Sequence, residues 1–443
     1  MPRIPWTFPA IVAVLLAASN GLPLHAVIQT ASPPPQDAAS AILAAFERYD
    51  VVGMSAAHSN EKLDDFILSL VQRPDFPLTV SDIVVECGNR RYQALLDRYI
   101  AGEDVPIEDA QRTWRDTTVL MCGLSGFYHQ FFPAIRALNR GLPPARRLRV
   151  LAGDPAVDWS LGDRAAVLQG ADRNASIAAV MTTEVLARHR KALALIGVGH
   201  LFHDDGRGTA VSAYEKTYPG RTFVIQTHEG FGAFFDLERG HQLEARMRTW
   251  AAPSIVLVNG SWLADLDLPY FLWPFPRRMA VKTITDLVDA YLYVGPVASM
   301  TYERTPDAIL NDASYIAELS RRFGVVDVEA LRRRNLNREL FTPADRAEAR
   351  QFAPGAECVG TYARKSGDAP EVEVDFRNGG LAARFGASKI WSPLAANGPS
   401  RYQTDSTTGP TVLEFDDAGG SVQRLTMTVG GSTKRQLVRV PGS

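Results

Sequence analysis

Four polar side chains in this sequence each follow a short apolar run, and their types could support chemistry. They are His58, Glu86, Asp154 and His200, which follow the runs 51–54, 83–85, 148–152 and 192–196, respectively. If the runs are parallel strands, their carboxyl ends share one edge of a sheet, where α/β proteins bind ligands. A turn or a helix cap would explain any one of these residues alone. Two histidines and a glutamate together, in a chain with eight histidines, favour a common site.

Four functions are open for these residues. In ester hydrolysis, His58 or His200 could deprotonate water, and Glu86 could orient the histidine. Alternatively, His58, Glu86 and His200 form a set of two histidines and one carboxylate that suits a divalent metal. Histidines could also ligate haem iron, or the chain could be an inactive scaffold. The sequence lacks a Gly-x-Ser-x-Gly motif, so we do not expect an ordinary serine esterase.

The pattern of apolar runs predicts how these residues are positioned. The runs alternate with amphipathic stretches, such as the one in which Leu63, Phe66, Ile67, Leu70 and Val71 recur at helical spacing. A long helix is expected over 175–190, and further strands are expected over 222–226 and 254–258. Such alternation predicts an α/β fold with a mostly parallel sheet flanked by helices. The aromatic segment 259–278 is interpreted either as a lid over the sheet edge or as ordinary surface packing.

The composition changes at about Gly355. Short alternating segments then recur between glycine-rich turns, at 371–376, 412–415, 425–429 and 437–440. This pattern is typical of a small antiparallel β domain. We therefore expect a signal peptide at 1–26, an α/β domain at 37–352 and an antiparallel β domain at 355–443.

The start of the chain and its net charge bear on location and partners. Arg3 precedes an apolar run at 11–18, and Leu24-His25-Ala26 offers a cleavage point, as in a secretory signal peptide. The run is too short to cross a bilayer, although an uncleaved anchor is the alternative. We expect a periplasmic or secreted protein with no stable membrane span after signal removal. The net charge of −2 gives no reason to expect nucleic-acid binding, so the expected partner is a small molecule.

The three cysteines are Cys87, Cys122 and Cys358. An exported protein can form disulfides, so a Cys87–Cys122 bridge is possible. Because an odd number leaves one cysteine over, three free and mostly buried thiols are the favoured interpretation.

From Val51 to His203 the chain resembles the superfamily that joins the erythromycin esterases, the Tiki metalloproteases and the ChaN-like haem-binding lipoproteins. The motifs that carry the resemblance are His58, the strand end Val84-Val85-Glu86-Cys87-Gly88-Asn89, the segment Arg149 to Pro155, Asp172-Arg173-Asn174 and the turn Gly197-Val198-Gly199-His200. The resemblance covers most of residues 40–300. It implies a hydrolase in which His58, Glu86, Arg173 and His200 are catalytic, with Arg173 stabilising the oxyanion, or else a haem- or small-ligand-binding protein of the ChaN type without catalysis.

Two motifs depart from this family pattern. Where the family has Gly-Glu, this chain has Ser55-Ala56, and where the family has Arg-Asp before the middle helix, the acid is replaced by Asn174. Both changes remove a carboxylate, so they point towards a degenerate member. The tail from about Gly355 to Val440 is similar to the lipocalin-like domain that follows some exported serine hydrolases.

Overall fold

The computed structural model describes most of the chain after residue 32. The described residues are 33–56, 60–203, 208–228, 243–266, 283–296, 299–338, 355–377, 380–388, 391–396, 400–406, 409–416 and 422–440. The predicted signal peptide at 1–26, His58 and most of the aromatic segment 259–278 lie outside them.

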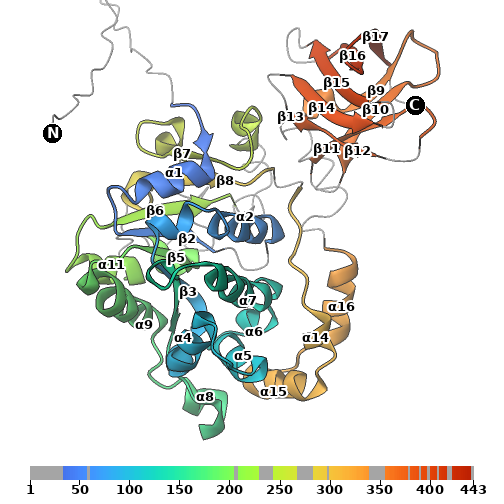
Figure 1. The fold of residues 1–443 in the computed structure, drawn as a ribbon. Coiled ribbons are helices and arrows are strands. Elements are labelled where there is room, and N and C mark those ends of the chain that lie inside the picture. Colours follow the sequence, from blue (N-terminus) through green and yellow to red (C-terminus); the bar gives the residue numbers. More distant parts are fainter. Residues whose placement is uncertain are drawn as a thin grey trace, which may run out of the picture. The chain divides into compact units, whose positions relative to one another are not determined.

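An eight-stranded sheet forms the centre of the α/β body (Figure 1). Its order is β1-β7-β8-β6-β2-β5-β3-β4, and the six strands from β8 to β4 are parallel, whereas β7 is antiparallel to both of its neighbours. The strands are β1 (Gln36–Asp37), β2 (Val51–Ser55), β3 (Asp82–Asn89), β4 (Arg149–Asp154), β5 (Ala192–Ile196), β6 (Thr222–Thr227), β7 (Ser254–Leu257) and β8 (Ala290–Tyr293). The predicted mostly parallel sheet is therefore confirmed.

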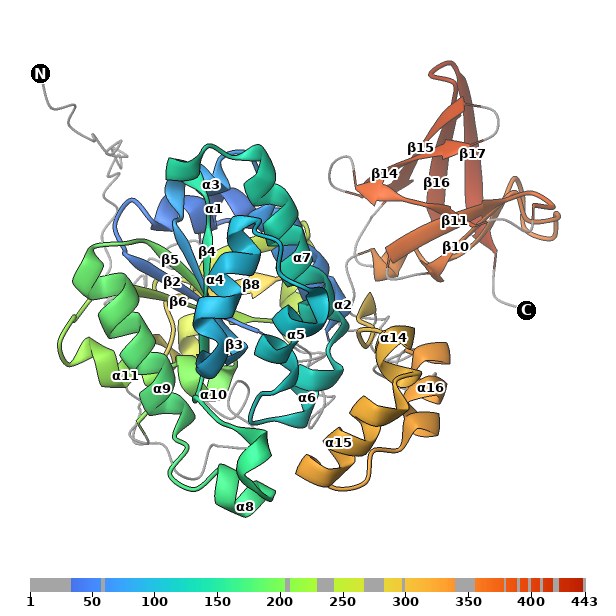
Figure 2. The ribbon, with the colours of Figure 1, turned by 60° about the horizontal axis from the view of Figure 1, so that its bottom comes forward.

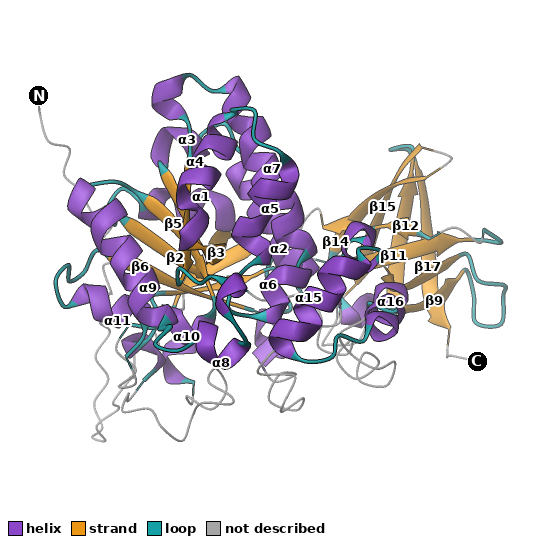
Figure 3. Ribbon diagram, turned by 90° about the horizontal axis from the view of Figure 1, so that it is seen from below, coloured by secondary structure: helices purple, strands orange, loops and turns teal. Residues whose placement is uncertain are grey.

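Helices cover both faces of this sheet, which explains its continuous apolar strands (Figures 2 and 3). One face packs against α1 (Ala38–Ala45), α2 (Glu61–Val71), α3 (Phe76–Thr79), α4 (Gln93–Ala101), α5 (Ile107–Arg115), α6 (Leu120–Leu124) and α7 (Gly126–Gly141). The other packs against α9 (Arg173–Val180), α10 (Val198–Leu201) and α11 (Ala210–Glu215). Successive strand residues alternate between the two cores: Val52 and Met54 belong to the first, and Val51 to the second.

Further helices lie outside these two layers. They are α8 (Arg164–Val167), α14 (Asp307–Leu310), α15 (Ala313–Phe323) and α16 (Val328–Leu336). Ile309, Tyr315 and Leu319 form a small separate core with Leu124 of α6. This core fixes α14 and α15 beside the loop that leads from α5 into α6.

Three expectations about local structure need correction. Glu86 does not follow its strand, because β3 continues to Asn89, which pairs with Asp154 after a register shift. Asp154 is likewise the last residue of β4 rather than part of a turn. The helix expected over 175–190 is regular only to Val180, and it continues as a π-helical turn at Met181–Val185 and a 3-10 turn at Leu186–Arg188.

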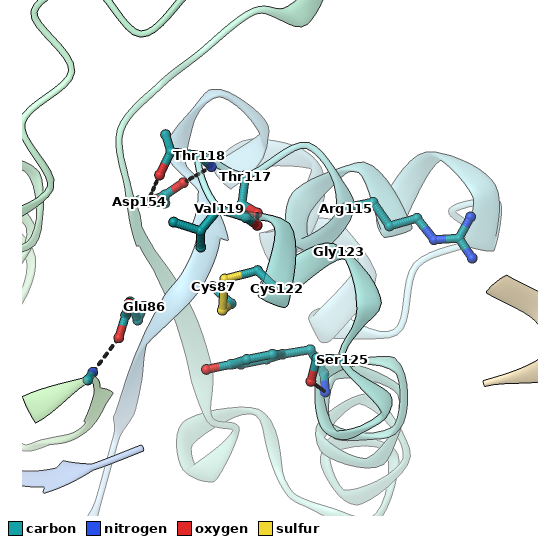
Figure 4. The surroundings of a disulfide bond; sticks show 12 residues. Glu86, Cys87, Arg115, Thr117, Thr118, Val119, Cys122, Gly123, Ser125 and Asp154 are labelled. Carbon is teal, nitrogen blue, oxygen red and sulfur yellow. Dashed lines mark hydrogen bonds between the residues drawn. A yellow bond between two sulfur atoms is a disulfide. The ribbon is translucent and has the colours of Figure 1, made fainter. Parts of the chain in front are cut away.

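The favoured interpretation of three free thiols is wrong. Cys87 of β3 and Cys122 of α6 form a disulfide, with their Cα atoms 5.3 Å apart, and both are buried. Figure 4 shows this bond between the strand that carries Glu86 and the segment that carries Thr118. Cys358 is buried and takes no part in a disulfide. The bridge was considered but not favoured, because the packing of α6 on β3 is a tertiary contact that the spacing of the cysteines does not reveal.

The C-terminal region is a second, antiparallel sheet, as expected. Its order is β12-β11-β10-β9-β17-β16-β15-β14-β13, and it curls around a core of its own (Figure 2). The strands are β9 (Gly360–Ala363), β10 (Val372–Arg377), β11 (Gly380–Phe385), β12 (Ser392–Pro393), β13 (Ala395–Ala396), β14 (Arg401–Ser406), β15 (Gly409–Asp416), β16 (Arg424–Val429) and β17 (Thr433–Val440). In the part of the chain that the structure describes, no helix has the length and apolar character needed to span a membrane.

Candidate functional site

Arg173 is the centre of a polar cluster at the carboxyl edge of the sheet. Its Nη2 donates to Oε1 of Glu86 at 2.7 Å, and its Nε donates to Oδ1 of Asp154 at 2.8 Å. The two carboxylates are almost fully buried, with side-chain exposures of 2% and 0%, whereas Arg173 keeps 20%. One guanidinium therefore links β3 and β4 and stays partly exposed.

The helix that carries Arg173 starts where it does because Asp172 caps it. The Asp172 carboxylate accepts a hydrogen bond from the backbone N–H of Ala175, so Arg173 and Asn174 occupy the first turn of α9. A cation at this end of a helix is disfavoured by the helix dipole. Glu86 and Asp154 outweigh that cost and the cost of burial, and the pKa of Arg173 is raised. The position of the cation thus depends on these two carboxylates.

His200 faces the same guanidinium from α10, directly after β5. Its Nε2 lies 3.4 Å from Nη1 of Arg173 and 3.7 Å from Oε1 of Glu86. The backbone N–H of Gly197, at the start of the same turn, donates to the other oxygen of Glu86. Glu86 therefore fixes both the guanidinium and the turn that carries His200.

Asn174 holds the other nitrogen of His200. Its Oδ1 lies 2.6 Å from Nδ1 of His200, while its Nδ2 donates to the carbonyl of Gly208 at 2.9 Å. Because the amide N–H₂ is directed at a carbonyl, the oxygen must face His200 and accept a hydrogen from Nδ1. In neutral His200, the lone pair then lies on Nε2, on the side of Arg173 and Glu86.

Asp154 is positioned by the loop between α5 and α6. The Thr118 hydroxyl donates to Oδ1 of Asp154 at 2.8 Å, and the Thr118 N–H donates to the other oxygen (Figure 4). Burial raises the pKa of Asp154, while Arg173 and Thr118 oppose that rise. Four residues beyond Thr118, the disulfide ties the same loop to β3. The loop is therefore anchored on both sides of the Glu86–Arg173–Asp154 cluster.

A second group of buried acids lies between α2 and α7. Glu303 accepts hydrogen bonds from the Ser125 hydroxyl at 3.0 Å and from the Phe127 N–H at 2.8 Å, at the start of α7. Burial raises the pKa of Asp64 well above its usual range, and the charges of Glu303, Asp65 and Glu61 add to this effect. Burial likewise raises the pKa of Tyr128, and the charges of Glu86, Asp64 and Glu303 add to this effect.

Two other histidines form separate polar networks. His203 lies between Glu215, at 2.9 Å, and Asp289, at 3.0 Å. Burial alone would lower the pKa of His203, but these two acids outweigh it and raise the pKa to about 9. This charged network fastens α11 to the segment before β8.

His228 lies at the carboxyl end of β6, the neighbour of β2 in the sheet. Its Nδ1 lies 2.7 Å from the hydroxyl of Tyr291, and its Nε2 lies 3.0 Å from Glu244. His228 and Glu244 are 2% and 1% exposed, so this network belongs to the interior.

Four residues, His58, Glu86, Arg173 and His200, were predicted to be catalytic. The structure brings three of them together: Glu86, Arg173 and His200. His58 lies outside the described residues, three positions beyond the last residue of β2. Ala56 is described, and its N–H donates to the carbonyl of Ile196 in β5. Asp154 was expected at this edge, but its bond to Arg173 was not, and Asn174 was regarded only as a lost acid. No sequence pattern pointed to the Thr118 loop or to the group around Tyr128, because their partners are distant in the sequence.

Neither a divalent metal nor haem gains support from the described part of the site. Among the described residues, no group of three histidine, cysteine or acidic side chains is arranged to hold a metal ion. Arg173 also occupies the space between Glu86 and Asp154, and its charge already compensates the carboxylates that a metal would need. Arg173 and Asn174, which contact the two ring nitrogens of His200, are polar, whereas a porphyrin requires apolar contacts.

Comparison with known proteins does not identify a family. No protein-family model matches the sequence, and no curated protein matches it. Among solved structures, a crystal structure of a Bacillus cereus protein is similar with a TM-score of 0.37 and 10% sequence identity, over 59% of this chain and 91% of that one. A match at this level says nothing about the function of this chain.

Proposed function

We propose that the α/β body is a hydrolase that cleaves ester bonds of a small molecule with water activated by His200. The observation that carries the proposal is the fixed arrangement of a histidine and an arginine: Nε2 of His200 lies 3.4 Å from Nη1 of Arg173, and Glu86 orients both. A neutral imidazole beside a permanent cation is a pairing that acyl transfer to water can use, as base and as oxyanion stabiliser.

The proposed reaction has two steps. Nε2 of His200 takes a proton from water as the water oxygen bonds to the carbonyl carbon, and the carbonyl electron pair moves onto its oxygen beside Arg173. The tetrahedral intermediate then re-forms the carbonyl and expels the alkoxide, which receives the proton from His200. Two of the five N–H groups of Arg173 donate to Glu86 and Asp154, which leaves three for the oxyanion, while Nε2 of His200, 3.4 Å from Nη1, keeps its lone pair for the proton of water.

The roles of the other residues follow from their contacts. Glu86 and Asp154 hold the guanidinium at the sheet edge, and Asn174 fixes the tautomer of His200. His58 remains a proposed second base or substrate-orienting group. We further propose that the protein is exported to the periplasm or secreted, which the buried Cys87–Cys122 disulfide supports because such bonds persist in oxidising compartments.

A panel of esters and lactones hydrolysed in ¹⁸O-labelled water tests this proposal. Attack of water on the acyl carbon places one label in the acid product of each turnover and none in the alcohol. The alternative, a binding protein of haem or another small ligand, predicts no turnover of any panel member. Absence of turnover across acyl chains of different length, with a protein that is folded by circular dichroism, would contradict the proposal.

A further inference from the structure

A cleft of about 680 Å³ lies at the opposite edge of the sheet from Arg173. Ser81 and Arg149, which line it, lie where β3 and β4 begin. The cleft is therefore separated from the candidate hydrolase site by the length of the strands, and none of its features enters the proposed reaction.

Five arginines line this cleft, and three of them are compensated by acids. Arg190 donates through Nε and Nη2 to the two oxygens of buried Asp82. Arg149 lies between Asp97, at 3.5 Å, and Glu184, at 3.3 Å, and Arg188 also pairs with Glu184. These three guanidinium groups hold the strand ends together, and their charge is largely balanced.

Arg146 and Arg147 are different. Among the described residues, neither has an ion pair, and their hydrogen bonds are long ones to the backbone carbonyls of Leu78, Leu142 and Ala101, at 3.3 to 3.4 Å. The one acid in the lining is Asp97, which is already engaged by Arg149 and by Gln93. Two adjacent, exposed arginines therefore bring uncompensated positive charge to one cleft. Paired guanidinium groups of this kind are suited to phosphate and carboxylate.

The same cleft has an apolar wall. Leu78, with 61% of its surface exposed, lies beside Pro77, Pro144 and Ala145. Polar and apolar surfaces thus meet within one hollow, and an inorganic ion would contact the arginines alone. We propose that this cleft binds a soluble amphipathic organic anion, with its phosphate or carboxylate on Arg146 and Arg147 and its apolar part against Leu78 and Pro144.

Isothermal titration calorimetry of the full chain with octyl phosphate tests the proposal. We expect octyl phosphate to bind at least about tenfold more tightly than inorganic phosphate, and the Arg146→Gln/Arg147→Gln double variant to weaken that binding by at least about tenfold, the effect of losing charge-assisted hydrogen bonds. Leu78→Ser should weaken the binding of octyl phosphate but not the binding of inorganic phosphate. These residues are at the surface, so the variants should fold, which a melting curve checks.

The matched control is Arg333→Gln, an exposed arginine of α16 whose ion pair with Asp327 is 3.8 Å long. It should leave binding unchanged. The proposal is overturned if octyl phosphate does not bind, if neutral octyl glucoside binds equally well, or if the double variant binds octyl phosphate like the wild type.

Discussion

Asn174 accepts a hydrogen bond from His200 with its neutral amide oxygen, 2.6 Å from Nδ1. In hydrolases that use a histidine base, a carboxylate at this place stabilises the imidazolium that forms during the reaction. An amide fixes the same tautomer but supplies no negative charge. The residue therefore orients His200 without strengthening it as a base.

Asn174→Asp should consequently raise activity. A carboxylate on Nδ1 would stabilise the protonated form of His200, so the acid limb of the pH–rate profile should move to higher pH. We expect kcat/KM on an active ester to rise by about tenfold or more, because the carboxylate stabilises the imidazolium that forms in the transition state. Asn174→Ala is the matched control and should lower the rate. An unchanged pH profile in Asn174→Asp would remove His200 from the role of base.

Removing Arg173 should destabilise the fold. Arg173→Met leaves the buried carboxylates of Glu86 and Asp154 without a cation, and we expect the free energy of unfolding to fall by about 3–5 kcal/mol in urea titrations at neutral pH. The loss should shrink in acid, where these groups bind protons. Arg333→Met breaks an exposed pair and should change stability by about 0–1 kcal/mol. Equal stability of the two variants would contradict the arrangement of the cluster.

His203 should make stability depend on pH on the alkaline side. Its pKa is about 9 in the folded protein against 6.5 for an ordinary histidine, so the stabilisation is complete below pH 6.5 and is lost as the pH rises through about 9. The change is on the order of 3 kcal/mol, at about 1.4 kcal/mol per pH unit. His203→Gln should be less stable at pH 6 and should show a flatter profile. Parallel profiles for wild type and variant would rule out a charged His203.

The disulfide should stabilise the α/β body. It closes a loop with a sequence separation of 35, for which the chain-entropy model gives about 4 kcal/mol. Cys87→Ala/Cys122→Ala should therefore lower the free energy of unfolding by about 2–4 kcal/mol. Thiol titration of the denatured protein checks the pairing: one thiol, Cys358, should react before reduction and three afterwards. Three reactive thiols without reduction would show that the bond is absent.

Much of the fold follows from local patterns in the sequence. The buried strands 51–54 and 192–196 are visible as apolar runs, and alternation marks 371–376 and 425–429, because burial on two faces or on one leaves a period in the sequence. The ends of β3 and β4 were misjudged, since Glu86, Asn89 and Asp154 are polar residues that tertiary contacts hold inside strands. From the sequence alone, a polar residue after an apolar run suggests that the strand has ended.

The sequence predicts which residues of the candidate site lie at the sheet edge, but it does not predict the hydrogen bonds between them. Parallel topology alone brings Glu86 and His200 to one edge. The link from Arg173 to Asp154, the amide partner of His200 and the support from Thr118 depend on side-chain packing between segments far apart in the chain. The Cys87–Cys122 bridge was one of two alternatives and could not be chosen for the same reason.

The rate of ester hydrolysis by His200→Ala tests the central proposal most directly. The matched control is His189→Asn, an exposed histidine whose left-handed backbone (φ 51°) asparagine also adopts. With the ester that the wild type turns over fastest, His200→Ala should lose a factor of about 10²–10⁴ in kcat/KM, the usual contribution of a general base. His189→Asn should retain the wild-type value. A His200→Ala rate equal to that of His189→Asn would contradict the proposed role of His200.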